Sequence, residues 1–130
     1  MKHNSAIYSL ITVLAAVCYA EVLEIQNPQQ FQEIIQNNSH VVADFYAPWC
    51  QPCLRMAPFL DSVSRENDNV IFVKLSHSND MVRSALFSQY NVHAFPTIIL
   101  FRNGQPSQVI QGTKTAAQLR RIVERLLTGN

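Results

Sequence analysis

Two mainly apolar runs, residues 41–47 and 70–75, each with one charged residue, do most to limit what this chain can fold into. Apolar runs of this length are typical of strands whose two faces are both covered. A third such strand is predicted at residues 97–101. Amphipathic segments separate the early strands, and strands that alternate with helices lie parallel and are joined by helical crossovers. The pattern therefore predicts an α/β fold.

Local signals place the remaining elements. Asn27-Pro28 is typical of a helix start, with Asn at the N-cap and Pro in the first turn. Asn103-Gly104 is a strong hairpin signal, and Thr115 opens a capping box before the last helix. The predicted elements are strands at 22–25, 41–47, 70–75, 97–101 and 108–110, and helices that start at about Asn27, Cys50, Asp80 and Thr115. The final hairpin adds an antiparallel pair, so we expect a central mixed β-sheet with helices on both faces.

Residues 1–20 have the order of charge and hydropathy that is typical of a secretory signal peptide. Lys2 and His3 precede a mostly apolar run of 11 residues, and Ala20 ends a small-residue cleavage site before Glu21. The run is shorter than the ~20 residues that a membrane span needs. We therefore expect an exported protein, periplasmic or secreted, with no stable membrane span after processing. The alternatives are an uncleaved N-terminal anchor, a buried first helix, a lipoprotein and a cytoplasmic protein.

The mature region, residues 21–130, has the length of one domain, and nothing in it demands more than a monomer. The whole chain carries 10 Lys and Arg against 9 Asp and Glu, without a basic cluster, so we expect no nucleic-acid partner. Removal of residues 1–20 also removes Cys18 and leaves Cys50 and Cys53. Export implies a compartment in which a disulfide can form and persist.

Cys50 and Cys53 carry the main chemical signal of the chain. Two cysteines three positions apart, after a strand and at the start of a helix, place both sulfurs on one turn, close enough to bond. The unpaired N–H groups and the positive end of the helix dipole stabilise a thiolate on the first cysteine. A thiolate is the nucleophile of disulfide exchange. We expect Cys50 to be the exposed nucleophile and Cys53 to be the more buried resolving thiol.

A metal site and a static disulfide are the alternatives for this pair. Zinc sites built on two such cysteines usually have a second ligand pair. The mature region instead has three scattered histidines, His40, His77 and His93. A static bridge across three residues would close a very short loop and remove little entropy from the unfolded chain. We therefore expect reactive sulfur chemistry, with no metal and no bound cofactor.

Residues 43–58, ADFYAPWCQPCLRMAP, resemble the active-site segment of the thioredoxin family. The Phe-Pro-Thr sequence at 95–97 and the Asn-Gly turn at 103–104 resemble the cis-proline loop and the hairpin of that family, in the same order and at matching separations. The resemblance covers essentially the whole mature region. It implies the thioredoxin fold and a thiol–disulfide oxidoreductase with a redox-active Cys50–Cys53 disulfide.

Asp44 and Lys74 gain roles from the same resemblance. Asp44 lies in the middle of an apolar strand, where burial raises the pKa of a carboxyl group. In the family, a buried Asp at this position relays the proton of the second cysteine, here Cys53, and a nearby Lys, here Lys74, tunes that Asp. A capped structural carboxylate and an ordinary edge charge are the alternative interpretations of Asp44 and Lys74.

The resemblance also implies a surface that docks an extended segment of the substrate. Pro96 matches the cis-proline of the family, and the backbone of Phe95 would bond to the substrate by β-addition. The residues expected at this surface are Trp49, Gln51, Pro52, Phe95, Pro96 and Gly112. Core packing is the alternative for Trp49. Gln51 stands where the family usually has Gly, and Leu54 replaces a usual Lys, which affects the range of partners.

Two functions fit these residues. The first is reduction or exchange of disulfides in protein substrates, with a separate redox partner that recharges the dithiol. Pro52 and the lack of a His between the cysteines favour the reducing direction. The alternative is a peptide-binding chaperone or adaptor of the same fold that uses Trp49, Phe95 and Gly112 without turnover.

Overall fold

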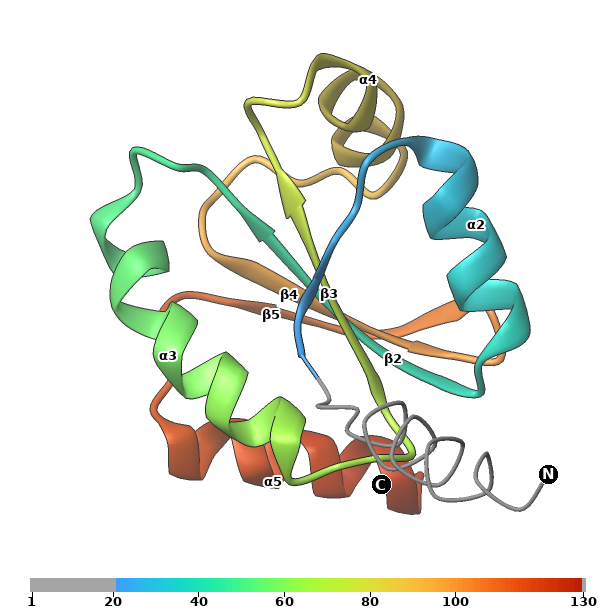
Figure 1. The fold of residues 1–130 in the computed structure, drawn as a ribbon, viewed down its shortest axis with the longest axis vertical. Helices are drawn as coiled ribbons and strands as arrows, with labels where there is room; N and C mark the ends of the chain where they lie inside the picture. The colour runs from blue at the N-terminus through green and yellow to red at the C-terminus, as the bar shows by residue number, and fades with distance from the viewer. Residues whose placement is uncertain (1–20, 130) are drawn as a thin grey trace, which may run out of the picture.

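The structure, a computed structural model, describes residues 21–129, which form a five-stranded mixed sheet (Figure 1). The strands lie in the order β1-β3-β2-β4-β5. Their bounds are β1 (Leu23–Glu24), β2 (His40–Tyr46), β3 (Ile71–Ser76), β4 (Thr97–Arg102) and β5 (Gln105–Gln111). β1 and β2 are both parallel to β3, which lies between them, whereas β4 is antiparallel to β2 and to β5. The mixed sheet expected from the sequence is confirmed.

Helices cover both faces of this sheet, as predicted (Figure 1). α3 (Gln51–Arg65) and α5 (Ala116–Thr128) pack on one face. α2 (Pro28–Asn37) and α4 (Asp80–Val82) lie over the other face, and α4 continues directly into a π-helical turn, η1 (Arg83–Phe87). The sheet is therefore the middle layer of three.

The alternation of side chains along the strands divides the core into two layers. The layer between α2 and the sheet contains Phe31, Ile35, Val41, Ala43, Phe45 and Phe101. The layer between the sheet and the helices α3 and α5 contains Val42, Met56, Leu60, Phe72, Ile98 and Leu119. Residues two apart on a strand point to the same face. Asp44 therefore shares the face of Val42 and lies on the side of the sheet that α3 covers.

Side-chain caps fix the starts of α2 and α5. Asn27 Oδ1 accepts a hydrogen bond from the Gln30 N–H at 2.9 Å. Thr115 Oγ1 accepts from the Gln118 N–H at 3.2 Å, and the Gln118 side chain accepts from the Thr115 N–H at 2.9 Å. Both caps predicted from the sequence are confirmed.

The start of α4 differs from the expectation by one residue. Asn79 is the N-cap, because its Oδ1 accepts from the Val82 N–H at 3.2 Å. Asp80, which the sequence suggested as the cap, is the first helical residue, and its carboxylate pairs with Arg83 at 2.8 Å. Asn and Asp are both good cap residues, and here the chain leaves the extended conformation at Asn79, so the amide takes the cap.

The hairpin after β4 also forms as predicted, with a longer return strand than expected. Asn103 and Gly104 have φ angles of 51° and 81°, the left-handed values that a tight two-residue hairpin requires. β5 covers Gln105–Gln111 rather than residues 108–110. Its side chains are mostly exposed at this edge of the sheet, and its first half carries no strand-like apolar pattern, so the sequence indicates only the second half of the strand.

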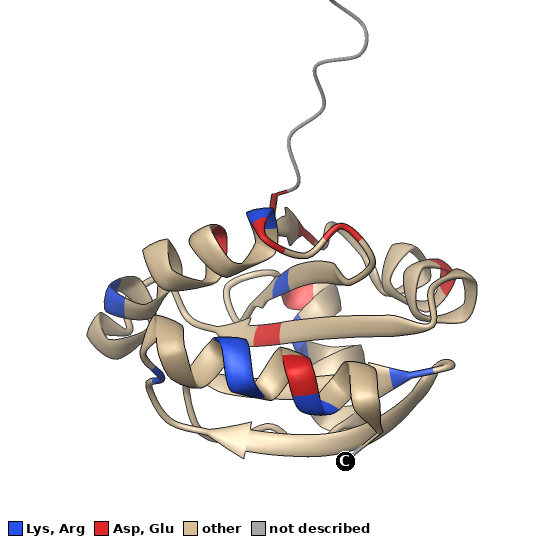
Figure 2. Ribbon diagram, turned by 90° about the horizontal axis from the view of Figure 1, so that it is seen from below, with Lys and Arg blue, Asp and Glu red and all other residues tan. Residues whose placement is uncertain are grey.

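Basic and acidic side chains are interspersed over the ribbon (Figure 2). Within residues 21–129 no helix combines the length and the apolar character that a membrane crossing needs. In the same part of the chain, no three His, Cys, Asp or Glu side chains gather as metal ligands would. The predicted signal peptide, residues 1–20, lies outside the described residues.

We expect Thr115→Ala to destabilise the protein, because it removes the side-chain acceptor of the capping box. The free energy of unfolding, measured by urea denaturation, should fall by about 1 kcal/mol. Thr113→Ala is the control, since Thr113 is exposed and precedes the helix. Equal losses of stability in the two variants would contradict the capping role.

Candidate active site

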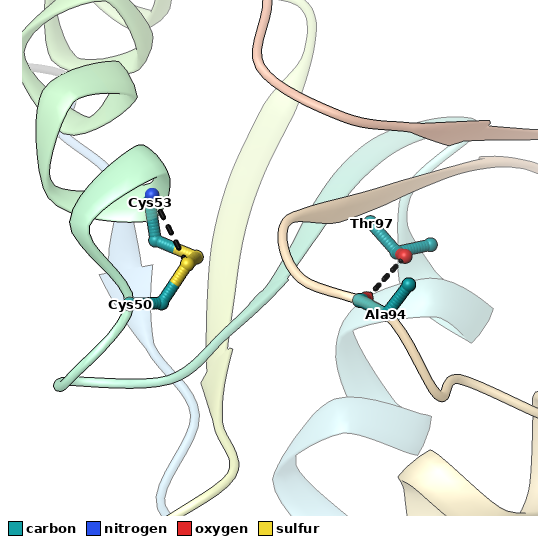
Figure 3. The surroundings of a disulfide bond; sticks show 4 residues. All are labelled: Cys50, Cys53, Ala94 and Thr97. Carbon is teal, nitrogen blue, oxygen red and sulfur yellow. Dashed lines mark hydrogen bonds between the residues drawn. A yellow bond between two sulfur atoms is a disulfide. The ribbon is translucent and has the colours of Figure 1, made fainter.

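The Cys50–Cys53 pair lies where β2 leads into α3. β2 ends at Tyr46, and a tight turn follows in which the Cys50 N–H donates to the Ala47 carbonyl at 3.1 Å. Cys50 is the N-cap of α3, its Cα lies 5.3 Å from that of Cys53, and the two sulfurs form a disulfide (Figure 3). Pro52 lies in the first helical turn, where its missing N–H costs no hydrogen bond. The motif therefore occupies the helix start that its spacing predicts.

The backbone around Cys50 favours a negative charge on its sulfur. The Cys53 N–H donates to Cys50 Sγ with an N–S distance of 3.2 Å. This N–H is one of the donors that the first turn of a helix leaves unpaired. Together with the positive end of the helix dipole, it stabilises a thiolate on Cys50 once the disulfide is opened.

The two cysteines differ in exposure less than we expected from the sequence. Cys50 is 6% exposed and Cys53 is 3% exposed, so both are buried. The predicted order is confirmed, but the expectation of an exposed Cys50 is wrong. The reason is local, because Tyr46 and Phe95 pack against the two cysteines. A substrate sulfur must therefore react with a Cys50 side chain that is mostly covered by protein.

The loop at residues 94–97 lies opposite the disulfide, and the sulfurs point toward it (Figure 3). Its Phe95–Pro96 peptide bond is cis, as the resemblance implies. Thr97 Oγ1 donates to the Ala94 carbonyl at 2.7 Å and closes the loop. This loop and the start of α3 together form the two sides of the site.

Exposed groups surround this site. Trp49 is 68% exposed, and its ring meets the Phe95 ring edge-on at a centroid distance of 5.8 Å. Core packing is therefore the wrong interpretation of Trp49. The Gly112 N–H donates to the Pro96 carbonyl at 2.9 Å, and Gly112 has a φ of +89°, which favours glycine. Gln51 is also exposed, so its side chain is part of the rim.

His77 belongs to this surface, although no sequence pattern singles it out. Its ring lies 5.1 Å from the Phe95 ring and 6.4 Å from the Trp49 ring, between centroids. His77 directly follows β3, whose end pairs with the end of β2. The carboxyl ends of neighbouring parallel strands lie at one edge of a sheet, so the predicted parallel pairing could have indicated that His77 lies near the cysteines.

Asp44 lies beneath the site on β2. It is 5% exposed, and its Oδ1 has no hydrogen-bond partner within the described residues. Burial is the main cause that raises the pKa of Asp44 from 3.8 to about 7, with Lys74 lowering it and Glu24 raising it. The raised pKa agrees with the expectation from the sequence, and no side chain or backbone group among the described residues caps Oδ1.

Lys74 is the register partner of Asp44 on the adjacent strand. β3 lies between β1 and β2, so Lys74 is not an edge charge. Its side chain is half-buried on the face that α3 covers, and its positive charge lowers the pKa of Asp44. The structure thus brings Lys74 and Asp44 together as the resemblance implies.

A redox disulfide at a helix start, opposed by a cis-proline loop, defines a thiol–disulfide oxidoreductase of the thioredoxin type. The family model for thioredoxin matches residues 22–125. The chain therefore belongs to the thioredoxin family.

Individual relatives agree with this assignment. The chain is 27% identical over 121 residues to the chloroplastic M-type thioredoxin of Spinacia oleracea, and this match covers 93% of the chain and 66% of the relative. It is 30% identical over 96 residues to thioredoxin 1 of Nostoc sp., covering 74% of the chain and 88% of the relative.

Solved structures show the same fold. The crystal structure of thioredoxin from Trypanosoma brucei brucei matches with a TM-score of 0.76 at 25% identity, covering 87% of the chain and 96% of that structure. The solution structure of oxidised thioredoxin from Plasmodium falciparum matches with a TM-score of 0.72 at 28% identity, covering 80% and 96%. The expected thioredoxin fold is confirmed.

Asp44→Asn should stabilise the protein in a pH-dependent way. The folded-state pKa of about 7 exceeds the ordinary 3.8, so the native protein keeps a proton that the unfolded chain releases between these values. Wild-type stability therefore falls as the pH rises from about 4 to about 7. Asn carries no charge, and we expect the variant to be more stable by roughly 2–4 kcal/mol at pH 8 and nearly equal at pH 4.

Urea denaturation at pH 4 and pH 8 measures this difference. Asp68→Asn, which changes an exposed carboxylate, is the control and should show no such gain at pH 8. A gain for Asp44→Asn of the same size at both pH values would contradict the buried-charge explanation.

Proposed function

We propose that the mature chain is an exported thioredoxin that reduces disulfides in protein substrates. The observation that carries the proposal is the Cys50–Cys53 disulfide, which sits at the start of α3 beside the cis-proline loop. This disulfide is the oxidised product of the proposed reaction. Pro52 and the residues between the cysteines, none of which is His, support the reducing direction.

The reaction begins from the reduced pair. The Cys50 thiolate attacks one sulfur of the substrate disulfide, the substrate S–S bond breaks, and the departing sulfur takes a proton from solvent. Cys53 then attacks Cys50 Sγ in the mixed disulfide, and the second substrate sulfur leaves. The substrate gains two electrons and two protons, and the protein gains the Cys50–Cys53 bond.

The burial of Asp44 supports a role in handling the proton of Cys53. Asp44 lies on the strand that leads to the cysteines, on the sheet face that α3 covers, and one of its carboxyl oxygens has no partner among the described residues. A group with a pKa of about 7 can both accept and return a proton near neutral pH. We assign Asp44 the role of proton acceptor for Cys53, through water, during attack on the mixed disulfide.

The substrate segment docks along the cis-proline loop. Within the described residues, the backbone of Phe95 has no hydrogen-bond partner and can pair with an extended chain. Trp49, Gln51 and Gly112 are exposed around this line and provide the contact surface. A separate redox partner with a dithiol or an equivalent two-electron donor then reduces the Cys50–Cys53 disulfide again.

Export rests on residues 1–20. Their basic start, apolar run and small residues before Glu21 have the order of a signal peptide. The match to the family begins at residue 22, just after the proposed cleavage site. The compartment reached is oxidising enough for disulfides to form, which supplies substrates for a reductase.

Replacing each cysteine by serine should block the reaction at a different step. Cys50→Ser should abolish reduction of insulin disulfides, because the attacking sulfur is gone. Cys53→Ser should stop at the mixed disulfide, which mass spectrometry would detect as a covalent adduct of protein and substrate. The double variant serves as the fold control, checked by circular dichroism. Full insulin reduction by Cys50→Ser would contradict the proposed mechanism, because the reaction would then proceed without the attacking sulfur.

Cleavage after Ala20 should give a mature protein that starts at Glu21. N-terminal sequencing of the protein purified from the native host, with cell fractionation, tests this. Ala20→Arg should block cleavage, because a small residue is required before the cut. A cytoplasmic protein that retains residues 1–20 would contradict the proposal.

A further inference from the structure

Four polar side chains project from neighbouring strands on the sheet face beneath α3. Glu24 of β1 is the register partner of Lys74 of β3, and Lys74 is the register partner of Asp44 of β2. Register partners on neighbouring strands project from the same face of a sheet. Tyr46 lies two residues beyond Asp44 on β2 and therefore shares this face.

Glu24 is fixed in this group by a side-chain hydrogen bond. The Tyr46 hydroxyl donates to Glu24 Oε1 at 2.5 Å. The other carboxylate oxygen, Glu24 Oε2, is buried and has no partner within the described residues, as is the case for Asp44 Oδ1. Two carboxyl groups with unpartnered buried oxygens therefore flank one lysine.

The charges around Asp44 come from a short set of groups. Lys74 faces it from β3 and Glu24 from β1, and Tyr46 is the titratable neighbour on its own strand. β4 contributes the apolar register partner Ile98, and Cys53 of α3 is held in the disulfide in this structure. One cation shared between two carboxylates cannot fully neutralise both. The charge on Glu24 therefore favours the protonated form of Asp44.

We propose that Glu24, held by the Tyr46 hydroxyl, is a positioning residue that competes with Asp44 for Lys74 and so governs the proton transfer from Cys53. This inference deepens the proposed function, since it rests on Asp44 accepting that proton. Glu24 does not touch the reacting sulfurs. It acts by setting the pH at which Asp44 becomes an ionised acceptor.

Replacing Glu24 by Gln removes one anion and leaves Lys74 to Asp44 alone. Asp44 should then release its proton at lower pH, by roughly half a unit to one unit for one partly screened charge. The acidic limb of the rate of mixed-disulfide resolution should move to lower pH by the same amount. Tyr46→Phe, which frees the Glu24 carboxylate but keeps the ring, should shift both in the same direction by less.

Two measurements on the mature protein test this. Carbon-13 NMR of the Asp44 carboxyl gives its titration directly, in the reduced protein and without a substrate. Stopped-flow kinetics with a fluorogenic peptide disulfide gives the pH profile of the resolving step. Glu33→Gln removes the same charge from an exposed residue of α2 and should leave both profiles where the wild type has them.

Each possible result either supports or overturns the inference. Parallel shifts of the titration and the rate limb in Glu24→Gln, absent in Glu33→Gln, support the inference. An unchanged Asp44 titration overturns it, and so does a shifted titration with an unshifted rate limb. If Glu24→Gln fails to fold, Tyr46→Phe decides by the same two criteria. Failure of the proposed function is distinct, because it would appear as full activity of Cys50→Ser.

Discussion

The packing of α3 on the sheet is the interaction on which the rest of this molecule depends. Met56 and Leu60 of the helix meet Val42, Phe72 and Ile98 of the strands in one buried layer. This contact fixes the start of α3, where unpaired N–H groups meet the Cys50 sulfur. It also removes water from the sheet beneath. One packing arrangement therefore prepares both the nucleophile and the buried carboxyl group of Asp44.

The sequence predicts most of this fold, because the relevant signals are local or strongly apolar. The runs that form β2 and β3 are mainly apolar, and the caps at Asn27 and Thr115 depend on residues within one turn. The cysteine spacing places both sulfurs without any tertiary information. Where two adjacent residues compete, as Asn79 and Asp80 do for the start of α4, local rules give no decision.

The features that the sequence does not predict are set by contacts between distant segments. The burial of Cys50 depends on Phe95, which is 45 positions away along the chain and packs against it in the fold. His77 joins the docking surface only because β3 ends beside β2. The hydrogen bond from Tyr46 to Glu24 spans 22 residues. Such pairs follow from strand order and register, which periodicity along the chain does not specify.

Strand order also places Asp44, at the centre of the sheet, in one row with a carboxyl group at the edge of the sheet. β1 is an edge strand of two residues, and β3 separates it from β2. Glu24, Lys74 and Asp44 therefore form a row from the half-exposed edge to the buried centre. Burial penalises the charged form of a carboxyl group, and this is the main cause that raises the pKa of Asp44 at the centre of the row. The proton exchange that we propose between Asp44 and Cys53 therefore depends on the depth of Asp44 in the sheet.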